Sequence, residues 1–366
     1  MVLLSGLSTG EREAASAAET IAEDIRTALN QPFQLGEVAH HSTASLGVTL
    51  FRDDLVNMDT LMKQADLAMY RAKAAGRNRI RFFDPTMESA VLERAALENG
   101  LRQAIDQRQF LLHFQAQVTG ENRLTGAEVL VRWQHPQRGM VSPAEFIPLA
   151  EETGLILPLG DWVLEAACLQ LAQWAEQTDM ASLTLSVNVS ARQFHQPDFV
   201  DRVLMILQQT GANPERLKLE LTESLLAENM QEMIGKMSVL KAQGIGFSLD
   251  DFGTGYSSLY YLKHLPLDQL KIDQSFVRDV LIDPNDAAIA RTIVALAQSL
   301  GLEVIAEGVE TEAQRDLLAS FGCHDYQGYL FSRPLPLNAF NELARRFGES
   351  VATAAEWTAG SDLAEV

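Results

Sequence analysis

The chain has 366 residues, and its 29 Lys and Arg against 49 Asp and Glu give a formal net charge of 29 − 49 = −20. A field of this sign disfavours nonspecific binding to long nucleic acids and to anionic membranes. The two cysteines lack metal-ligand spacing and make no disulfide framework, and no apolar run is long enough to span a bilayer. We expect a cytoplasmic protein with no membrane segment in this chain, although a longer parent protein could be membrane-tethered.

Residues 1–85 form a first unit in which strand and helix patterns alternate. We expect strands and helices in the order Val2–Leu4 (strand), Glu11–Leu29 (helix), Ser42–Phe51 (strand), Met58–Ala74 (helix) and Ile80–Phe83 (strand). Five such elements make half of an α/β domain, which buries too little apolar surface to be stable alone.

Residues 86–107 are predicted to form a connecting helix. Leu97, Leu101 and Ile105 make an apolar stripe at helical spacing, which fits a helix that enters the next domain. At the other end of the chain, residues 349–366 are polar and rich in alanine, and we expect them to form a flexible tail.

Between these segments, residues 108–348 alternate regularly between strand and helix patterns. The strand candidates are Phe110–Val118, Ala127–Trp133, Leu183–Val189, Leu217–Leu221, Gly246–Asp250, Gln269–Ile272, Glu303–Ala306 and Asp325–Tyr329. The helices include Leu159–Gln177, which would begin just after Pro158, Met230–Gln243 and Ala287–Leu300. About eight strands alternating with helices predict a (β/α)8 TIM-like barrel, with an open doubly wound sheet as the alternative.

Polar side chains fall near the C-terminal ends of these strands. They are Glu128, Asn188, Glu220, Asp250 with Asp251, Lys271, Glu307 with Glu310, and Gln327. In a barrel these ends converge on one face, where active sites lie. Any single member could be a loop residue or a helix cap. The whole series is different, because buried strands do not hold acids and amides in apolar runs unless these are paired or bound to metal.

The run Asp250-Asp251-Phe252-Gly253-Thr254-Gly255 places two carboxylates side by side at a strand end. Their repulsion needs compensation, which a divalent cation commonly supplies. A solvated turn is the alternative interpretation of this stretch alone. Carboxylate and amide oxygens without His or Cys suit Mg²⁺ or Mn²⁺, and the number of oxygens favours two metals that share Asp250.

Paired metals of this kind are an arrangement for phosphoester hydrolysis. Strand alternation places Arg132 on the same side as Glu128, where it could clamp a phosphate. Lys271 could hydrogen-bond the attacking water. A structural salt bridge is the competing role for each of these two cations.

The chain from about Leu97 to Phe347 resembles an EAL domain, the cyclic-di-GMP phosphodiesterase family. The motifs that carry the resemblance are Glu128-Val129-Leu130 with Arg132, Asn188-Val189-Ser190, Glu220-Leu221-Thr222-Glu223, Asp250 to Gly255, Lys271-Ile272-Asp273, Ala306-Glu307-Gly308-Val309-Glu310 and Gln327-Gly328. The resemblance implies a modified (β/α)8 barrel whose first strand runs antiparallel. It also implies hydrolysis of cyclic-di-GMP to linear pGpG, which lowers this second messenger in bacterial signalling and biofilm control.

The resemblance also implies roles for single residues. Two Mg²⁺ or Mn²⁺ ions would be bound by Glu128, Asn188, Glu220, Asp250 and Asp251. The catalytic residues would be Glu128, Asp251, Lys271, Glu307 and Gln327. The substrate would be bound by Gln115, Leu130, Arg132 and Glu310. Glu223 would brace the loop Asp250–Ser258, which also contributes to homodimerisation in the family.

Two departures from the family pattern are visible. Val129 replaces the Ala of the name-giving motif, and alternation turns it away from Glu128, so the change adds volume in packing and removes no ligand. Ala116-Gln117 replaces the more usual Pro-Ile after Gln115, which puts little in doubt. The alternatives to a phosphodiesterase are a receptor that binds cyclic-di-GMP without hydrolysis and a two-metal nuclease on long nucleic acid. The net charge argues against the nuclease.

Residues 1–85 resemble the C-terminal half of a GGDEF (diguanylate cyclase) domain. The matching runs are Thr43 to Val48 and Ala65 to Asn78. The family's signature hairpin and phosphate-binding half would lie before Met1. We therefore expect no cyclase activity through the family's known residues. We also expect this chain to be a fragment of a longer protein, or its first unit to be a degenerate remnant.

Overall fold

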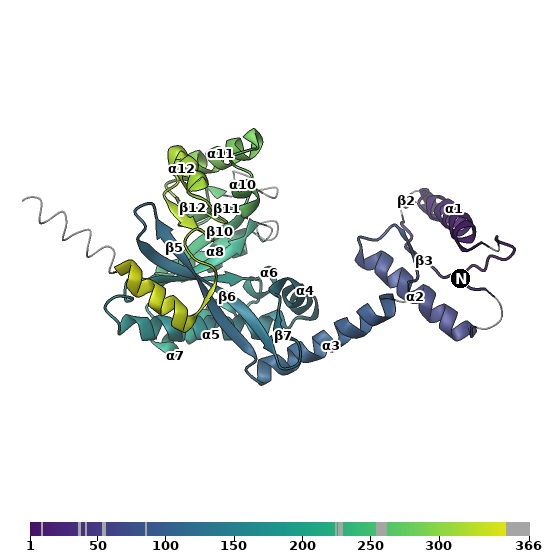
Figure 1. The fold of residues 1–366 in the computed structure, drawn as a ribbon, viewed down its shortest axis with the longest axis horizontal. Helices are drawn as coiled ribbons and strands as arrows, with labels where there is room; N and C mark the ends of the chain where they lie inside the picture. Colours follow the sequence, from purple (N-terminus) through teal and green to yellow (C-terminus); the bar gives the residue numbers. More distant parts are fainter. Residues whose placement is uncertain are drawn as a thin grey trace, which may run out of the picture. The chain divides into compact units, whose positions relative to one another are not determined.

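The computed structural model describes residues 1–8, 10–35, 38–40, 42–52, 56–84, 86–223, 225, 230–253 and 262–348. The chain divides into two compact units, Met1–Asn99 and Gly100–Val366 (Figure 1). The division falls inside helix α3 (Thr86–Asp106), which occupies the segment expected to connect the domains. The expected tail, residues 349–366, lies outside the described residues.

Ahead of α3, the described residues of the first unit form two helices and two small sheets. Its elements before α3 are α1 (Glu11–Leu29), β1 (Phe33–Leu35), β2 (Val38–His40), β3 (Leu46–Val48), α2 (Met58–Ala74) and β4 (Ile80–Phe82). Both helices begin and end where the sequence predicts. The strand expected at Val2–Leu4 is wrong, because these residues pair with no described strand, and Val2 and Leu3 are exposed. The strand expected over Ser42–Phe51 is only β3, and the antiparallel hairpin β1–β2 was not predicted.

Helix α2 lies directly against strand β3, which pairs in parallel with β4. The closeness of this contact depends on Gly47. A Cβ atom at this position would lie 2.0 Å from the carbonyl oxygen of Ala65 and 2.3 Å from the backbone nitrogen of Met69. The glycine of the first matching run and the helix of the second are therefore one packing unit.

The second unit is a closed barrel of eight strands, which confirms the predicted fold class and excludes the open sheet. In order around the barrel the strands are β5 (Phe110–Thr119), β6 (Leu124–His135), β8 (Thr184–Val189), β9 (Leu217–Thr222), β10 (Gly246–Phe252), β11 (Gln269–Ile272), β12 (Glu303–Ala306) and β13 (Asp325–Gln327). β5 pairs antiparallel with both β6 and β13, and the other neighbours are parallel. The first strand thus closes the barrel in the expected antiparallel direction.

Two short strands extend the barrel sheet, β7 (Gly139–Val141) on β6 and β14 (Leu335–Pro336) on β5. The eighth barrel strand ends at Gln327 and not at Tyr329. The chain turns away at Gly328, where a Cβ atom would lie 2.2 Å from the carbonyl oxygen of Val309. This close approach requires glycine and holds Gln327 at the end of its strand.

Helices cover the outside of the barrel; α11, for example, packs against β11 and β12 and lies beside α12 in Figure 1. They are α4 (Pro143–Thr153), α5 (Ile156–Ala175), α6 (Ala191–Phe194), α7 (Phe199–Thr210), α8 (Met230–Ala242), α10 (Gln274–Arg278), α11 (Pro284–Leu300) and α12 (Glu312–Phe321), with a 3-10 turn, η1 (Pro214–Arg216), and a helix over residues 337–348. Helix α5 begins at Ile156, before Pro158, because the first turn has no intrahelical acceptor for its N–H groups and so tolerates proline. No described helix is both long and apolar enough to cross a membrane.

Alternation along each strand separates the core from the site. In β9, Leu217, Leu219 and Leu221 are buried on one face, and Glu220 lies on the other face. In β6, Val129 is buried next to its strand partners Phe114 and Val187, and Glu128 has the opposite orientation. Apolar residues thus pack the strands against the helices, while polar residues face the barrel interior.

Candidate active site

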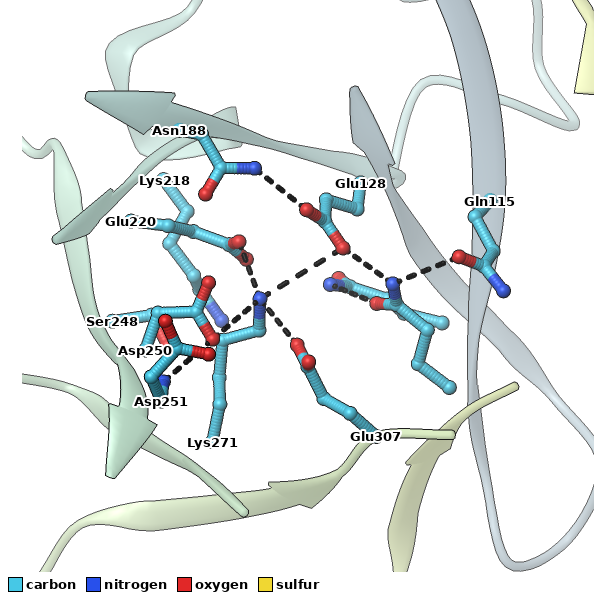
Figure 2. A network of polar contacts seen from close by, with 12 residues as sticks. Gln115, Glu128, Asn188, Lys218, Glu220, Ser248, Asp250, Asp251, Lys271 and Glu307 are labelled. Carbon is cyan, nitrogen blue, oxygen red and sulfur yellow. Dashed lines mark hydrogen bonds and ion pairs between the residues drawn. The ribbon is translucent and has the colours of Figure 1, made fainter. Parts of the chain in front are cut away.

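A fully buried lysine, Lys271 on β11, lies at the centre of a cluster of acids from four other strands and strand ends (Figure 2). Its Nζ atom is 2.5 Å from Glu220 Oε2, 3.2 Å from Asp250 Oδ1 and 3.8 Å from Glu128 Oε2, and it forms an ion pair with Glu307. These residues are far apart in sequence, and the barrel brings them together at the C-terminal ends of its strands.

Strand register explains this convergence. Asn188 on β8 lies opposite Glu220 on β9, and Glu220 lies opposite Ser248 on β10. On the closing side, Gln115 on β5 lies opposite Glu128 on β6. Glu128 itself lies opposite Ser186, two residues before Asn188 on β8, so the polar residues gather near the strand ends without all lying at one level.

The carboxylate of Glu128 is held by two carboxamides. Asn188 Nδ2 donates a hydrogen bond to Glu128 Oε1 at 2.6 Å, and Gln327 Nε2 donates to Glu128 Oε2. Gln327 Nε2 also lies 3.2 Å from Gln115 Oε1. Both oxygens of Glu128 thus have donors, so its orientation is determined before any ligand binds.

Asp251 leaves the regular strand through a bulge in β10. The register between β10 and β11 shifts between Leu249 and Phe252, and Asp251 has a left-handed backbone with φ of 56°. Aspartate tolerates this region better than most residues. The bulge lets two adjacent acids share one region, and the Asp251 N–H donates to Asp250 Oδ1 at 2.9 Å.

Burial and mutual repulsion raise several acid pKa values in this cluster. Burial raises the pKa of Glu220 to about 7, and the charges of Glu128 and Asp250 add to this while Lys271 opposes it. Burial and Asp250 raise the pKa of Asp251 to about 6. Burial alone would lower the pKa of Lys271, but its four acidic neighbours raise it well above the usual range, so the ammonium stays charged.

The donor set fits a hard divalent cation. One ammonium faces four carboxylates, which leaves excess negative charge, and Glu220 Oε1 is buried with no hydrogen-bond partner among the described residues. Within the described ranges, no three His, Cys, Asp or Glu side chains are already grouped as metal ligands. Glu128, Asn188, Glu220, Asp250 and Asp251 are the residues that would hold such a cation, and the carboxylates of Glu128, Glu220 and Asp250 lie within 4 Å of the Lys271 ammonium.

The expected substrate-binding residues are less closely joined to this cluster. Arg132 is half-buried, and its Nη1 donates to the carbonyl oxygen of Val131 at 2.9 Å. Burial lowers its pKa, and the nearby charge of Glu128 opposes this. Leu130 is half-buried on the same strand. Glu310 is exposed, and its backbone N–H donates to Gln314 Oε1, so the structure does not bring its carboxylate to Lys271.

Glu223 is placed to support the loop after β10. Its Oε2 accepts a hydrogen bond from the backbone N–H of Gly253 at 3.0 Å. The remainder of the expected Asp250–Ser258 loop, from Thr254 onward, lies outside the described residues. The contact therefore concerns the first residues of the loop.

The structure adds two residues that the sequence interpretation did not assign. Gln117 Nε2 donates to Gln327 Oε1 at 3.0 Å, and the carbonyl oxygen of Ser332 accepts from Gln115 Nε2 at 3.2 Å. A signal for Gln117 was available, because it lies two residues from Gln115 on a strand and so shares its face. No comparable signal marks Ser332.

Two known protein-family models match this chain. The model of the EAL domain matches residues 98–334, which is more than half of the chain. The model described as Diguanylate cyclase, GGDEF domain, matches residues 1–79.

The chain is similar to full-length signalling proteins of which it covers only part. The bifunctional diguanylate cyclase/cyclic di-GMP phosphodiesterase MucR of Pseudomonas aeruginosa is 44% identical over 326 residues, 89% of this chain and 47% of MucR. The cyclic di-GMP phosphodiesterase PdeR of Escherichia coli is 38% identical over 332 residues, 91% of this chain and 50% of PdeR. The chain thus spans about half the length of these curated relatives.

Solved structures agree with the family match. The PaMucR phosphodiesterase in its c-di-GMP complex has 45% sequence identity and a TM-score of 0.65, and the match covers 67% of this chain and 99% of that chain. The FimX EAL domain from Pseudomonas aeruginosa bound to c-di-GMP has 25% identity and a TM-score of 0.59, over 65% of this chain and 96% of that chain. This chain belongs to the EAL domain family and carries a region that matches the GGDEF domain ahead of its barrel.

Proposed function

We propose that this chain hydrolyses one phosphodiester of cyclic-di-GMP to give linear pGpG, with Mg²⁺ or Mn²⁺ as cofactor. The observation that carries the proposal is the convergence of Glu128, Glu220, Asp250 and Glu307 on Lys271 at the carboxyl ends of the barrel strands. The names of the relatives support the substrate, since MucR and PdeR are cyclic di-GMP phosphodiesterases.

The divalent cations, when bound, supply a Lewis acid that polarises the phosphodiester and compensates its charge. Glu128, Asn188, Glu220, Asp250 and Asp251 would hold them. The Glu128 carboxylate is already oriented for cation binding, because Asn188 and Gln327 donate hydrogen bonds to its two oxygens.

Lys271 and Glu307 are the proton-handling pair of the proposed reaction. The Lys271 ammonium donates to the attacking water or to the phosphate oxygen, which favours the developing negative charge. Burial raises the pKa of Glu307 well above its usual range, and Lys271 opposes this, so the Glu307 carboxylate is a better proton acceptor than an exposed one and would take the proton of the attacking water. Arg132, on the same strand as Glu128, would pair with the second phosphate.

The decisive test is hydrolysis of cyclic-di-GMP with Mn²⁺ or Mg²⁺, with the products separated by chromatography. The wild-type chain should yield pGpG, and activity should vanish on chelation of the metal. Glu128→Gln and Asp250→Asn should each lower kcat/KM at least about a hundredfold, or ~2.7 kcal/mol.

A matched control is Glu303→Gln. Glu303 begins β12, at the opposite end of its strand from the site, and its side chain is 67% exposed. This variant should hydrolyse at the wild-type rate. Tight binding of cyclic-di-GMP without turnover would contradict the proposal and favour the non-hydrolytic receptor. Dimerisation and cytoplasmic location stay predictions from the resemblance and the composition.

A further inference from the structure

The barrel interior contains a chain of two carboxamides, Gln117 and Gln327, that ends at Glu128, and a third, Gln115, accepts a hydrogen bond from Gln327. Gln117 on β5 donates from Nε2 to Gln327 Oε1 at 3.0 Å, across the antiparallel pair β5–β13, in which these two residues are direct partners. Gln327 Nε2 then donates to Glu128 Oε2 and to Gln115 Oε1. Gln117 and Gln327 are each only 4% exposed.

The direction of this chain matters because a carboxamide has one donor end and one acceptor end. If the amide of Gln327 were reversed, its oxygen would face the carboxylate oxygen of Glu128, and the two acceptors would repel each other. The Glu128 carboxylate can only accept, so Gln327 turns its Nε2 to Glu128 and its Oε1 away, and Gln117 Nε2 supplies the donor that this buried Oε1 needs in that orientation. Bulk water does not reach these buried groups to replace the contact.

We infer that Gln117 is a positioning residue of the active site, which acts through Gln327 to hold the Glu128 carboxylate in the orientation that binds the metal. The inference rests on the proposed function for its metal, and it extends the site to a position outside the motifs of the resemblance. Gln117 itself touches neither Glu128 nor Lys271 through any hydrogen bond of the described residues, so its effect must pass through Gln327.

The test is a double-mutant cycle read out by metal binding. Mn²⁺ affinity is measured by titration calorimetry for the wild type, Gln117→Met, Gln327→Met and the double variant. Each single change should weaken Mn²⁺ binding about tenfold, the lower end for partners of metal ligands. The double variant should bind no more weakly than Gln327→Met, because Gln117 has then lost the residue through which it acts.

Two further variants separate positioning from general packing. Gln117→Ile also removes the donor but is β-branched and suited to a strand, so it provides a folded chain if the Met variant is unstable. Gln170→Met removes a different buried glutamine, on α5, and should leave Mn²⁺ affinity unchanged. Hydrolysis by Gln117→Ile should fall at limiting Mn²⁺ and recover at saturating Mn²⁺, which a loss of folding would not show.

The outcomes distinguish the two proposals. Equal Mn²⁺ affinity in wild type and both Gln117 variants overturns the positioning role, whatever the hydrolysis assay shows. Losses that multiply in the double variant also overturn it, because Gln117 would then act independently of Gln327. A wild-type chain that binds Mn²⁺ but does not hydrolyse cyclic-di-GMP contradicts the proposed function alone, and a wild-type chain that binds no Mn²⁺ overturns both.

Discussion

Lys271 places a buried ammonium among four carboxylates, so its removal leaves those acids without their compensating charge. Lys271→Met should lower the free energy of unfolding of the metal-free protein by about 3–5 kcal/mol, the usual cost of breaking a buried ion pair. Added Mn²⁺ should restore much of this loss, because the cation replaces the ammonium as partner of the acids. Urea unfolding with chelator and with Mn²⁺ measures both effects.

Lys218→Met is the matched control for that prediction. Lys218 lies on β9 two residues from Glu220, and its Nζ donates to the neutral acceptor Gln269 Oε1 and lies 4.0 Å from the exposed Glu303. Its loss should cost about 1 kcal/mol and should respond to Mn²⁺ as the wild type does. If both variants lose the same stability, Lys271 does not compensate the site acids as argued.

The raised acid pKa values predict a pH dependence of metal binding. The folded-state pKa of Glu220 is about 7 against an ordinary value of 4.5, and that of Asp251 is about 6 against 3.8. Protons and metal compete for these oxygens, so Mn²⁺ affinity should rise with pH between about 5 and 7.5. Calorimetry in buffers of different ionisation enthalpy should detect protons released on binding.

The raised pKa of Glu220 also determines whether the metal-free protein gains or loses stability as the pH rises. Because the folded pKa of Glu220 lies above the unfolded value, its contribution is fully present below pH 4.5 and is lost as pH rises through about 7. Unfolding free energy in chelator should therefore fall over this window, and saturating Mn²⁺ should remove the fall. An Mn²⁺ affinity that does not change from about pH 5 to 7.5 would contradict both the predicted rise in metal affinity and the predicted fall in metal-free stability.

At the scale of elements, the contact of α2 with β3 leaves no space for a side chain at position 47. Gly47→Val should destabilise this part of the first unit by about 1–3 kcal/mol, because overpacking forces the helix away from the strand. Hydrogen exchange of the amides of α2 and β3 should report the loss. Gly235→Ala is the control, since a Cβ there meets nothing within 4 Å, and it should be neutral or slightly stabilising.

Strand β10 departs from regular strand geometry at the candidate active site. A regular strand would turn Asp250 and Asp251 to opposite faces. The register shift between Leu249 and Phe252 and the left-handed backbone at Asp251 change this alternation. The local strain is offset by the surrounding barrel, whose strands on both sides hold β10 in place.

At the scale of the whole molecule, the net charge of −20 opposes the approach of an anionic dinucleotide. Screening by salt should therefore increase kcat/KM for cyclic-di-GMP a few-fold between low and physiological ionic strength, at saturating metal. Steady-state kinetics over a KCl series measure this. A fall in kcat/KM over the same series would mean that the cations of the site attract the substrate more strongly than the whole chain repels it.

Local sequence patterns predicted the eight barrel strands and the polar residues at their ends, but not the short strands β1, β2, β7 and β14. Strands Gln269–Ile272 and Glu303–Ala306 and helix Met58–Ala74 have the bounds that their patterns predict, because hydrophobic periodicity is a local property of the chain. The acids at the strand ends could be recognised for the same reason. Where a pattern had no sheet to join, as at Val2–Leu4, the prediction failed, because a strand forms only against a partner.

The contacts between these residues arise from the tertiary fold. Gln117 and Gln327 are separated by 210 positions, and Lys271 and Glu220 by 51, so no local pattern encodes their contacts. The register between β5 and β13 brings Gln117 to Gln327. Lys271 meets Glu220 because both side chains face the barrel interior. Burial determines which faces of the strands turn inward, and this can be predicted from the sequence. The hydrogen-bond partners depend on the register between strands, and the first and last barrel strands meet only when the barrel closes.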